Sequence, residues 1–230
     1  MRVMVAYKKG EDIRYIGHLD LMRSMQRALR RSGLPISYSN GFNPHIRLSF
    51  AAPLSVGVVG LHELMEVPLQ AGVSDAEFMR AMNAVLPHCM RIMACREISD
   101  AFPTLMSLVA GSRYTIRLER SNAAERVVQK VDAFMALASY TALRKTKSGE
   151  NDCDIRPFVR SAACSEDDNG YVIQIETLCT NAGALKPSLW FNCLCEFAGE
   201  EPLECVIYRD AILAKNARGA LIPMEELPNV

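Results

Sequence analysis

No stretch of the sequence is apolar for long enough to cross a membrane. Half of the 230 residues are hydrophobic, yet no run approaches the roughly 18 consecutive apolar residues of a transmembrane helix. The apolar part of the opening MRVMVAYKKG is also too short for a secretory signal peptide. From these absences we expect a cytoplasmic protein without a membrane partner.

The eight cysteines include no C-x-x-C pair. Zinc sites and iron–sulfur clusters need sets of closely spaced Cys or His ligands, so the spacing predicts neither a metal site nor a bound cofactor. In a reducing compartment the thiols are expected to remain unpaired. They are then interpreted as small apolar side chains that pack in the interior.

Common catalytic motifs are missing as well. The sequence contains no G-x-S-x-G nucleophile elbow, P-loop or G-x-G-x-x-G, and its four histidines are scattered. One catalytic hypothesis stays open: His18, Asp20 and His45 could do acid–base work or bind a metal if the loop around His45 faces a helix start. The interpretation that we favour has His18 capping a helix and His45 hydrogen-bonding within a turn, so no catalytic residue is predicted.

What the chain does have is an uneven charge. Lysines and arginines balance acidic residues overall, at 26 each, but residues 1–50 hold nine basic against three acidic residues, a net charge of +6. Such asymmetry marks either a face for nucleic acid or another acidic ligand, or an unevenly charged wet surface.

A basic amphipathic helix accounts for much of this charge. Apolar residues recur with a period of 3.6 from about His18 to Ser32, and Gly33 followed by Pro35 ends the helix. The opposite face carries arginines at four positions, namely Arg23, Arg27, Arg30 and Arg31. This stripe predicts a phosphate-binding surface; the alternative is the wet side of an amphipathic helix.

The order of predicted elements indicates an α+β fold. The first half has strand candidates at Arg2–Tyr7, Leu64–Leu69 and Cys89–Ile98; between the first two, the short segments Ile36–Tyr38 and Ile46–Phe50 flank a loop and count together as one candidate. With the basic helix and a second helix that Ser74 begins, the order is β-α-β-β-α-β, the split βαβ of a ferredoxin-like fold.

The second half repeats this plan with one extra strand. Its elements include a helix from Asn122 to about Ala138, a strand over Cys153–Val159, a loop over Ser165–Gly170 and a helix that Pro187 opens and Gly199 closes. We therefore predict two tandem ferredoxin-like halves. The predicted boundaries are 1–98 for the N-terminal half, 99–111 for a connector, 112–210 for the C-terminal half and 211–230 for an extended tail.

The segment YSNGFNPHIRLSF, from Tyr38 to Phe50, is the most distinctive part of the chain. Its Asn-Gly and Asn-Pro pairs are typical of turns, while the free N–H groups of a helix start at Gly17 attract phosphates. Tyr38, Phe42 and Phe50 are candidate platforms for unpaired bases or core residues. The predicted RNA- or anion-binding set is Arg14, His18, Arg23, Arg27, Arg30, Arg31, Asn40, Gly41, Phe42, Asn43, His45 and Arg47.

A family resemblance lies chiefly in one long block, YIGHLDLMRSMQRALRRSGLPISYSNGFNPHIRLSFAAPLSVGV. It resembles the signature of the radical-SAM-linked domain of unknown function, which occurs in bacteria fused to a radical SAM enzyme or encoded beside one. Gly17 stands where the family usually has Ser, and Ile46 where Pro is frequent. CDIRPFV and GALKPSLW resemble weaker family blocks, so the resemblance extends to about Arg209.

This resemblance implies an accessory or substrate-recognition protein that works with a radical SAM protein on RNA or another anionic ligand. The cysteines of the iron–sulfur cluster would then belong to the partner. The tandem plan is also similar to CRISPR repeat-processing endonucleases and pseudouridine synthases, a fold analogy that carries little functional weight. Two alternatives stay open: an RNA-processing or RNA-modifying enzyme that uses His18, Asp20 and His45, and a protein-interaction module without nucleic acid.

Overall fold

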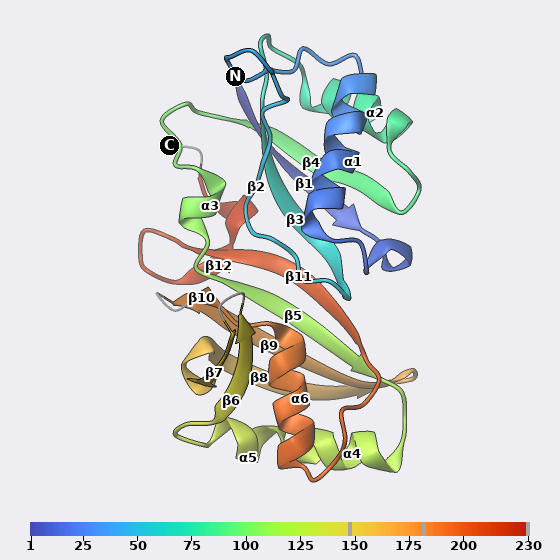
Figure 1. The fold of residues 1–230 in the computed structure, drawn as a ribbon, viewed down its shortest axis with the longest axis vertical. Helices are drawn as coiled ribbons and strands as arrows, with labels where there is room; N and C mark the ends of the chain where they lie inside the picture. Colours follow the sequence, from blue (N-terminus) through green and yellow to red (C-terminus); the bar gives the residue numbers. More distant parts are fainter. Residues whose placement is uncertain (147–148, 181–182, 229–230) are drawn as a thin grey trace. The chain divides into compact units, whose positions relative to one another are not determined.

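The computed structural model describes residues 1–146, 149–180 and 183–228. The chain forms two compact units. Unit 1 consists of Met1–Val109 together with Arg209–Val230, and unit 2 of Ala110–Tyr208. Both contain helices and strands (Figure 1), so the α+β class is confirmed. No helix within the described ranges is long and apolar enough to span a membrane.

The sheet of unit 1 is built around a central strand. β1 (Arg2–Lys9) pairs antiparallel with β3 (Val58–Pro68) on one side and with β4 (Met90–Ile98) on the other. A very short strand, β2 (Ser49–Phe50), pairs with β3. The segment before β2 was predicted to form longer strands. Instead it forms two isolated β-bridges, one from Ile36 to Leu69 and one within the segment, between Tyr38 and Ile46.

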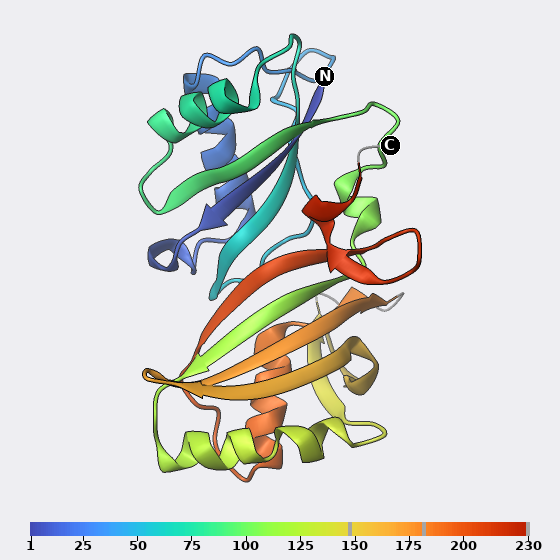
Figure 2. The ribbon, with the colours of Figure 1, turned by 180° about the vertical axis from the view of Figure 1, so that it is seen from behind.

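Two helices cover one face of this sheet. α1 (His18–Arg31) confirms the predicted basic helix and buries an apolar stripe that includes Met25 and Leu29. α2 (Asp75–Val85) begins as predicted, because Ser74 Oγ caps the helix by accepting a hydrogen bond of 3.3 Å from the backbone N–H of Glu77. In Figure 1 α1 lies in front of the strands, and in Figure 2 the strands lie in front of α1.

The other face of the sheet is covered by the end of the chain. The predicted extended tail, residues 211–230, is wrong. β11 (Val206–Lys215) continues well beyond Arg209, and β12 (Leu221–Pro223) and the 3-10 helix η3 (Met224–Glu226) follow it. Ile212, Ala214 and Met224 are buried in a core that also takes Met4 and Ala6 from β1. Because β1 is buried on both faces, its sequence is a continuous apolar run rather than an alternating one.

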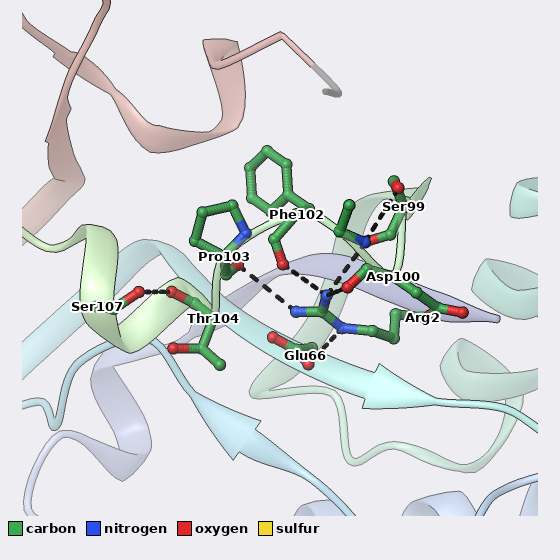
Figure 3. Close-up of polar contacts among 9 residues, drawn as sticks. Arg2, Glu66, Ser99, Asp100, Phe102, Pro103, Thr104 and Ser107 are labelled. Carbon is green, nitrogen blue, oxygen red and sulfur yellow. Dashed lines mark hydrogen bonds and ion pairs between the residues drawn. The ribbon is translucent and has the colours of Figure 1, made fainter.

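The predicted connector, residues 99–111, belongs to unit 1 as far as Val109. It contains the short helix α3 (Leu105–Leu108). Arg2 holds this segment through its guanidinium, which donates to Glu66 Oε1 at 2.9 Å and to backbone carbonyl oxygens of the segment (Figure 3). The accepting carbonyls are those of Ser99 at 3.1 Å, Asp100 at 3.2 Å, Phe102 at 2.6 Å and Pro103 at 3.5 Å.

Unit 2 has helices on one face of an antiparallel sheet. β9 (Gly170–Thr180) lies between β5 (Gly111–Leu118) and β8 (Val159–Asp167). Figure 2 shows β8 and β9 in front of α6, and Figure 1 shows α6 in front of them. The remaining elements are α4 (Asn122–Gln129), α5 (Val131–Met135), β10 (Gly183–Ala184), α6 (Pro187–Phe197) and a separate hairpin of β6 (Thr141–Thr146) and β7 (Gly149–Asp154).

Several predictions for unit 2 need correction. The helix predicted from Asn122 is two helices, and Ser121 caps the first through a 3.0 Å bond from the N–H of Ala124. The strand predicted over Cys153–Val159 gives way to a 3-10 helix, η2 (Arg156–Phe158), whose proline lacks a backbone donor. The loop predicted over Ser165–Gly170 is mostly strand: β8 continues to Asp167 and β9 begins at Gly170, so only residues 168–169 connect the β8–β9 hairpin.

Candidate anion-binding surface of unit 1

The predicted site residues lie at opposite ends of β1. The N–H of Ser37 donates to Pro68 O at 3.1 Å, and Pro68 pairs with Arg2, so the chain after α1 lies beside the start of β1. Lys9 Nζ donates to Ile16 O at 3.0 Å, so the chain before α1 lies beside the end of β1. The seven steps from Arg2 to Lys9 span about 23 Å. α1 therefore runs back along β1 and connects two separate surfaces.

This arrangement keeps His18 away from His45. His18 opens α1, and its ring contacts the Phe50 ring edge-on at 5.2 Å between centroids. The N-cap of α1 is Gly17, without a side-chain cap bond, so His18 does not cap the helix. Asp20 pairs with Arg23 at 3.1 Å on the exposed surface. Within the described ranges, no hydrogen bond or ion pair joins His18, Asp20 and His45, each of which has a different partner.

The surface at the end of β1 is held by a buried lysine. Lys9 is only 1% exposed, and its ammonium donates to Arg14 O at 2.9 Å as well as to Ile16 O. Burial lowers the pKa of Lys9, against the opposing effect of Glu63. The Arg14 guanidinium contacts Glu11 at 2.6 Å and lies over the Tyr15 ring. Arg14 is therefore engaged locally rather than beside the loop that follows α1.

The surface at the start of β1 is a short hairpin over Ser37–Arg47. The N–H of Arg47 donates to Ser37 O at 2.9 Å, and the N–H of Ser39 donates to His45 O at 2.8 Å. Tyr38 and Ile46 form a bridge between these bonds. The turn needs Gly41, whose φ of +123° is unfavourable for other residues. The backbone bonds give the loop a defined shape.

The hairpin presents its tip to solvent. Phe42 has a relative exposure of 105%, Tyr38 one of 39%, whereas Phe50 is 5% exposed and belongs to the core. Asn40 and Asn43 flank Phe42 and are exposed as well. Of the three aromatic candidates, only Phe42 offers both faces of its ring.

The ring of His45 is oriented by a residue that the sequence analysis did not single out. Ser39 Oγ lies 2.7 Å from His45 Nδ1 and accepts a 3.1 Å hydrogen bond from the His45 N–H. The two residues face each other across the Asn-Gly turn, which is the only sequence signal for their contact. His45 thus hydrogen-bonds within the turn, and its Nε2 is left for another group.

Four arginines near this end have no carboxylate partner within the part of the chain that the structure describes. Arg27 donates to Ser24 Oγ at 3.0 Å, and Arg31 donates to Val85 O at 2.8 Å. Arg30, on α1, and Arg47, on the hairpin, are exposed. Because the last turn of α1 lies at the start of β1, the helix adds cationic side chains to the end of unit 1 that carries the hairpin.

A polar cavity of about 240 Å³ lies elsewhere in unit 1. Basic and acidic side chains both line it, so it does not select a ligand of one charge. The lining residues are Lys8, Gly10, Glu11, Asp12, His88, Cys89 and Arg91. Among the described residues, no three Cys, His, Asp or Glu side chains are grouped closely enough to hold a metal ion.

Comparison with known proteins gives one family and a fold likeness. The model of a family described as "Uncharacterized protein conserved in bacteria (DUF2344)" matches residues 2–187. No curated protein matches the chain. A chain of the "Crystal Structure of a Cbf5-Nop10-Gar1 Complex" is similar with a TM-score of 0.51 and 9% identity, over 90% of this chain and 47% of that chain. This chain thus spans about half the length of that neighbour, and the likeness concerns the fold alone.

Proposed function

Because the chain belongs to the DUF2344 family of bacterial proteins, whose description assigns no activity, we propose a function from its surface: an accessory or substrate-recognition protein that binds RNA through unit 1. The observation that carries this proposal is the gathering of exposed arginines, which have no carboxylate partner in the described part of the chain, beside a hairpin with a fully exposed Phe42. Arginines bind phosphates, and an exposed aromatic ring binds bases.

The charge arrangement supports a polyanionic ligand. Each phosphate that an arginine neutralises releases condensed counterions, so affinity comes largely from such contacts and falls with salt. The His18 ring packs on Phe50 and the His45 ring contacts Ser39, and these separate contacts support a binding surface in preference to the enzymatic alternative. RNA binding without catalysis by this chain is therefore the function that the described residues support best.

We also propose that the protein works in the cytoplasm with a radical SAM protein. This proposal rests on the resemblance of the long block from Tyr15 to Val58 to the radical-SAM-linked signature. The opposite end of unit 1 offers a surface for such a partner, since Tyr15, Leu19 and Val56 are exposed by 69%, 60% and 61%. Large apolar side chains at the surface are common in protein interfaces.

The finer fold proposal is a ferredoxin-like plan for each unit. In unit 1 the strand order β4-β1-β3, in which β3 also pairs with β2 and β11, supports it together with α1 and α2 on one face. In unit 2 the order β8-β9-β5 with helices on one face supports it as well. The hairpin of β6 and β7 would be an addition to the plan.

Filter binding of cellular RNA to the purified protein over a salt series tests the RNA proposal. We expect retention at low salt that falls linearly on a plot of log affinity against log salt concentration. Binding that is absent at low salt, or that does not change with salt, would contradict the proposal.

Co-purification tests the partner proposal separately. A radical SAM protein that is co-expressed with this chain should be retained by the wild type and by an Arg27→Glu/Arg30→Glu variant, but not by Leu19→Asp. Loss of the partner in the arginine variant, with folding intact, would instead favour a protein-interaction module that uses the basic face.

A further inference from the structure

We propose that the hairpin over Ser37–Arg47 binds an unpaired nucleotide, with the base stacked on Phe42 and the adjoining phosphate held by His45 and Arg47. This inference rests on the proposed RNA binding and specifies the form of RNA, a single strand. It also assigns a different task to each of the three side chains.

Phe42 is exposed at the tip of a hairpin of defined shape. Backbone hydrogen bonds of 2.8 and 2.9 Å close the hairpin below the tip, so the ring is carried by a defined loop rather than by a free chain end. Its 105% exposure means that it contributes nothing to the core, although burial of an aromatic side chain is favourable by a few kcal/mol. A ring held in water at a fixed place is suited to a flat ligand that covers it.

An unpaired base is the part of RNA that fits such a ring. In a duplex both faces of each base are covered by neighbouring bases, whereas unpaired bases can stack on aromatic side chains. The exposed amides of Asn40 and Asn43 flank Phe42, and amides hydrogen-bond to base edges. The hairpin tip thus offers a stacking face with polar groups at its rim.

The alternation along the second arm of the hairpin places the phosphate-binding groups. Ile46 is 2% exposed and points into the core, so its neighbours His45 and Arg47 point to the opposite side. Both are exposed. Two cationic or donor groups two residues apart on one face match the spacing needed to hold one phosphate from two sides.

Ser39 prepares His45 as a donor. The Ser39 Oγ accepts a hydrogen bond from the backbone N–H of His45 at 3.1 Å. The Ser39 hydroxyl can then donate its own proton to Nδ1 of the His45 ring, which lies 2.7 Å away. In a neutral imidazole whose Nδ1 accepts, the proton resides on Nε2. Nε2–H then points a hydrogen-bond donor away from Ser39, which suits a phosphate oxygen. Ser39 is a positioning residue in this arrangement.

Fluorescence anisotropy with a labelled 12-nucleotide RNA, single-stranded or annealed to its complement, tests the proposal. The wild type should bind the single strand more tightly than the duplex at the same salt concentration. Phe42→Ala should weaken single-strand binding about tenfold, the effect of losing one stacked base, and should leave duplex binding unchanged. Phe42→Trp should retain the preference, and Phe42→Leu should lose it.

Tyr15→Ala is the matched control, because it removes an exposed aromatic ring at the opposite end of unit 1. It should bind both RNAs like the wild type. If the single strand and the duplex bind equally well and Phe42→Ala changes neither, this inference is wrong while RNA binding stands. If neither RNA binds at low salt, the proposed function itself fails.

The role of Ser39 has its own readout. The ¹⁵N shifts of the His45 ring should show a proton on Nε2 in the wild type and a mixture of both tautomers in Ser39→Ala. The same variant should weaken single-strand binding less than His45→Ala does. A wild-type ring with the proton on Nδ1 would overturn the assignment.

Discussion

Four arginines of unit 1 and four of unit 2 can be compared directly, and the two sets differ in their partners. In unit 2 every member pairs with a carboxylate: Arg113 and Arg160 with Glu176, at 2.8 and 3.3 Å, Arg117 with Asp167 at 2.8 Å, and Arg120 with Glu166. The set in unit 1, Arg27, Arg30, Arg31 and Arg47, has no such partner among the described residues. The number of arginines therefore does not locate an anion site; their pairing does.

The difference has a local cause. In unit 2 the strand register places Arg113 directly opposite Glu176 on the neighbouring strand, and opposite charges in that position attract. On α1 the basic residues are four apart, at Arg23, Arg27 and Arg31, where like charges repel by about 0.2–0.5 kcal/mol per pair. Unit 1 thus retains an unfavourable charge arrangement, as expected of a surface kept for a ligand.

The largest effect is expected where an arginine is paired and buried. Arg209 and Glu63 are 3% and 1% exposed, and the guanidinium also donates to Ala52 O at 3.1 Å and Pro53 O at 3.2 Å. Arg209→Ala should lower the free energy of unfolding of unit 1 by about 3–5 kcal/mol, because it leaves a buried carboxylate without its partner.

Urea unfolding followed by circular dichroism measures this loss. The double variant Glu63→Leu/Arg209→Met should recover most of it, since it removes both charges. A loss below about 1 kcal/mol for Arg209→Ala, the range of exposed pairs, would show that burial does not distinguish this pair from those of unit 2.

A smaller effect, of opposite sign, is expected on α1. Arg27→Glu converts two like-charge neighbours, Arg23 and Arg31, into attractive pairs, and should raise the free energy of unfolding by about 0.5 kcal/mol. The same change should weaken RNA binding. Thermal unfolding and anisotropy on one preparation measure both. A variant that is less stable, or that binds RNA as well as the wild type, would contradict the account of this surface.

The smallest effect concerns the contact between His62 and Glu225. His62 Nδ1 lies 3.0 Å from Glu225 Oε1, and this hydrogen bond raises the pKa of His62 despite the effect of burial. A raised pKa stabilises the folded protein below the unfolded value of about 6.5, and this contribution is lost as pH rises through the folded value.

We expect a loss of a few tenths of a kcal/mol, because the pair is partly exposed. Hydrogen exchange in the C-terminal segment around η3, measured on both sides of neutral pH, would show it. His62→Asn should remove the pH dependence. If protection from hydrogen exchange around η3 increased with pH in the wild type, the effect on stability would have the opposite sign, and the raised pKa of His62 would be contradicted.

Local signals predicted three of the helices well, namely α1, α2 and α6. α1 and α2 have strong caps or a 3.6-residue apolar period, and α6 begins at the proline and ends before the glycine that the sequence indicates. The second half of β11 was missed, because the extended tail was predicted to begin just after the charged Arg209. Its charge is buried against Glu63, 146 residues away, and no local pattern reveals such a pair.

The residues of the candidate surface were predictable, but their grouping was not. Exposed arginines follow from the helical period, and the turn from Asn-Gly. Which of them lie together depends on α1 running back along β1, and that direction follows from long-range bonds such as Lys9 to Ile16 and Ser37 to Pro68. Gly17 and the hairpin were therefore predicted to form one site, whereas the structure places them at opposite ends of α1.

The salt dependence of RNA binding tests the central claim most directly. We compare Arg27→Ala/Arg30→Ala in unit 1 with Arg113→Ala/Arg117→Ala in unit 2, two variants that remove the same charge. The first should reduce the slope of log affinity against log salt by about 0.7 per arginine on single-stranded RNA, and the second should leave the slope unchanged. Equal reductions in both variants would contradict the claim that unpaired arginines define the RNA-binding surface.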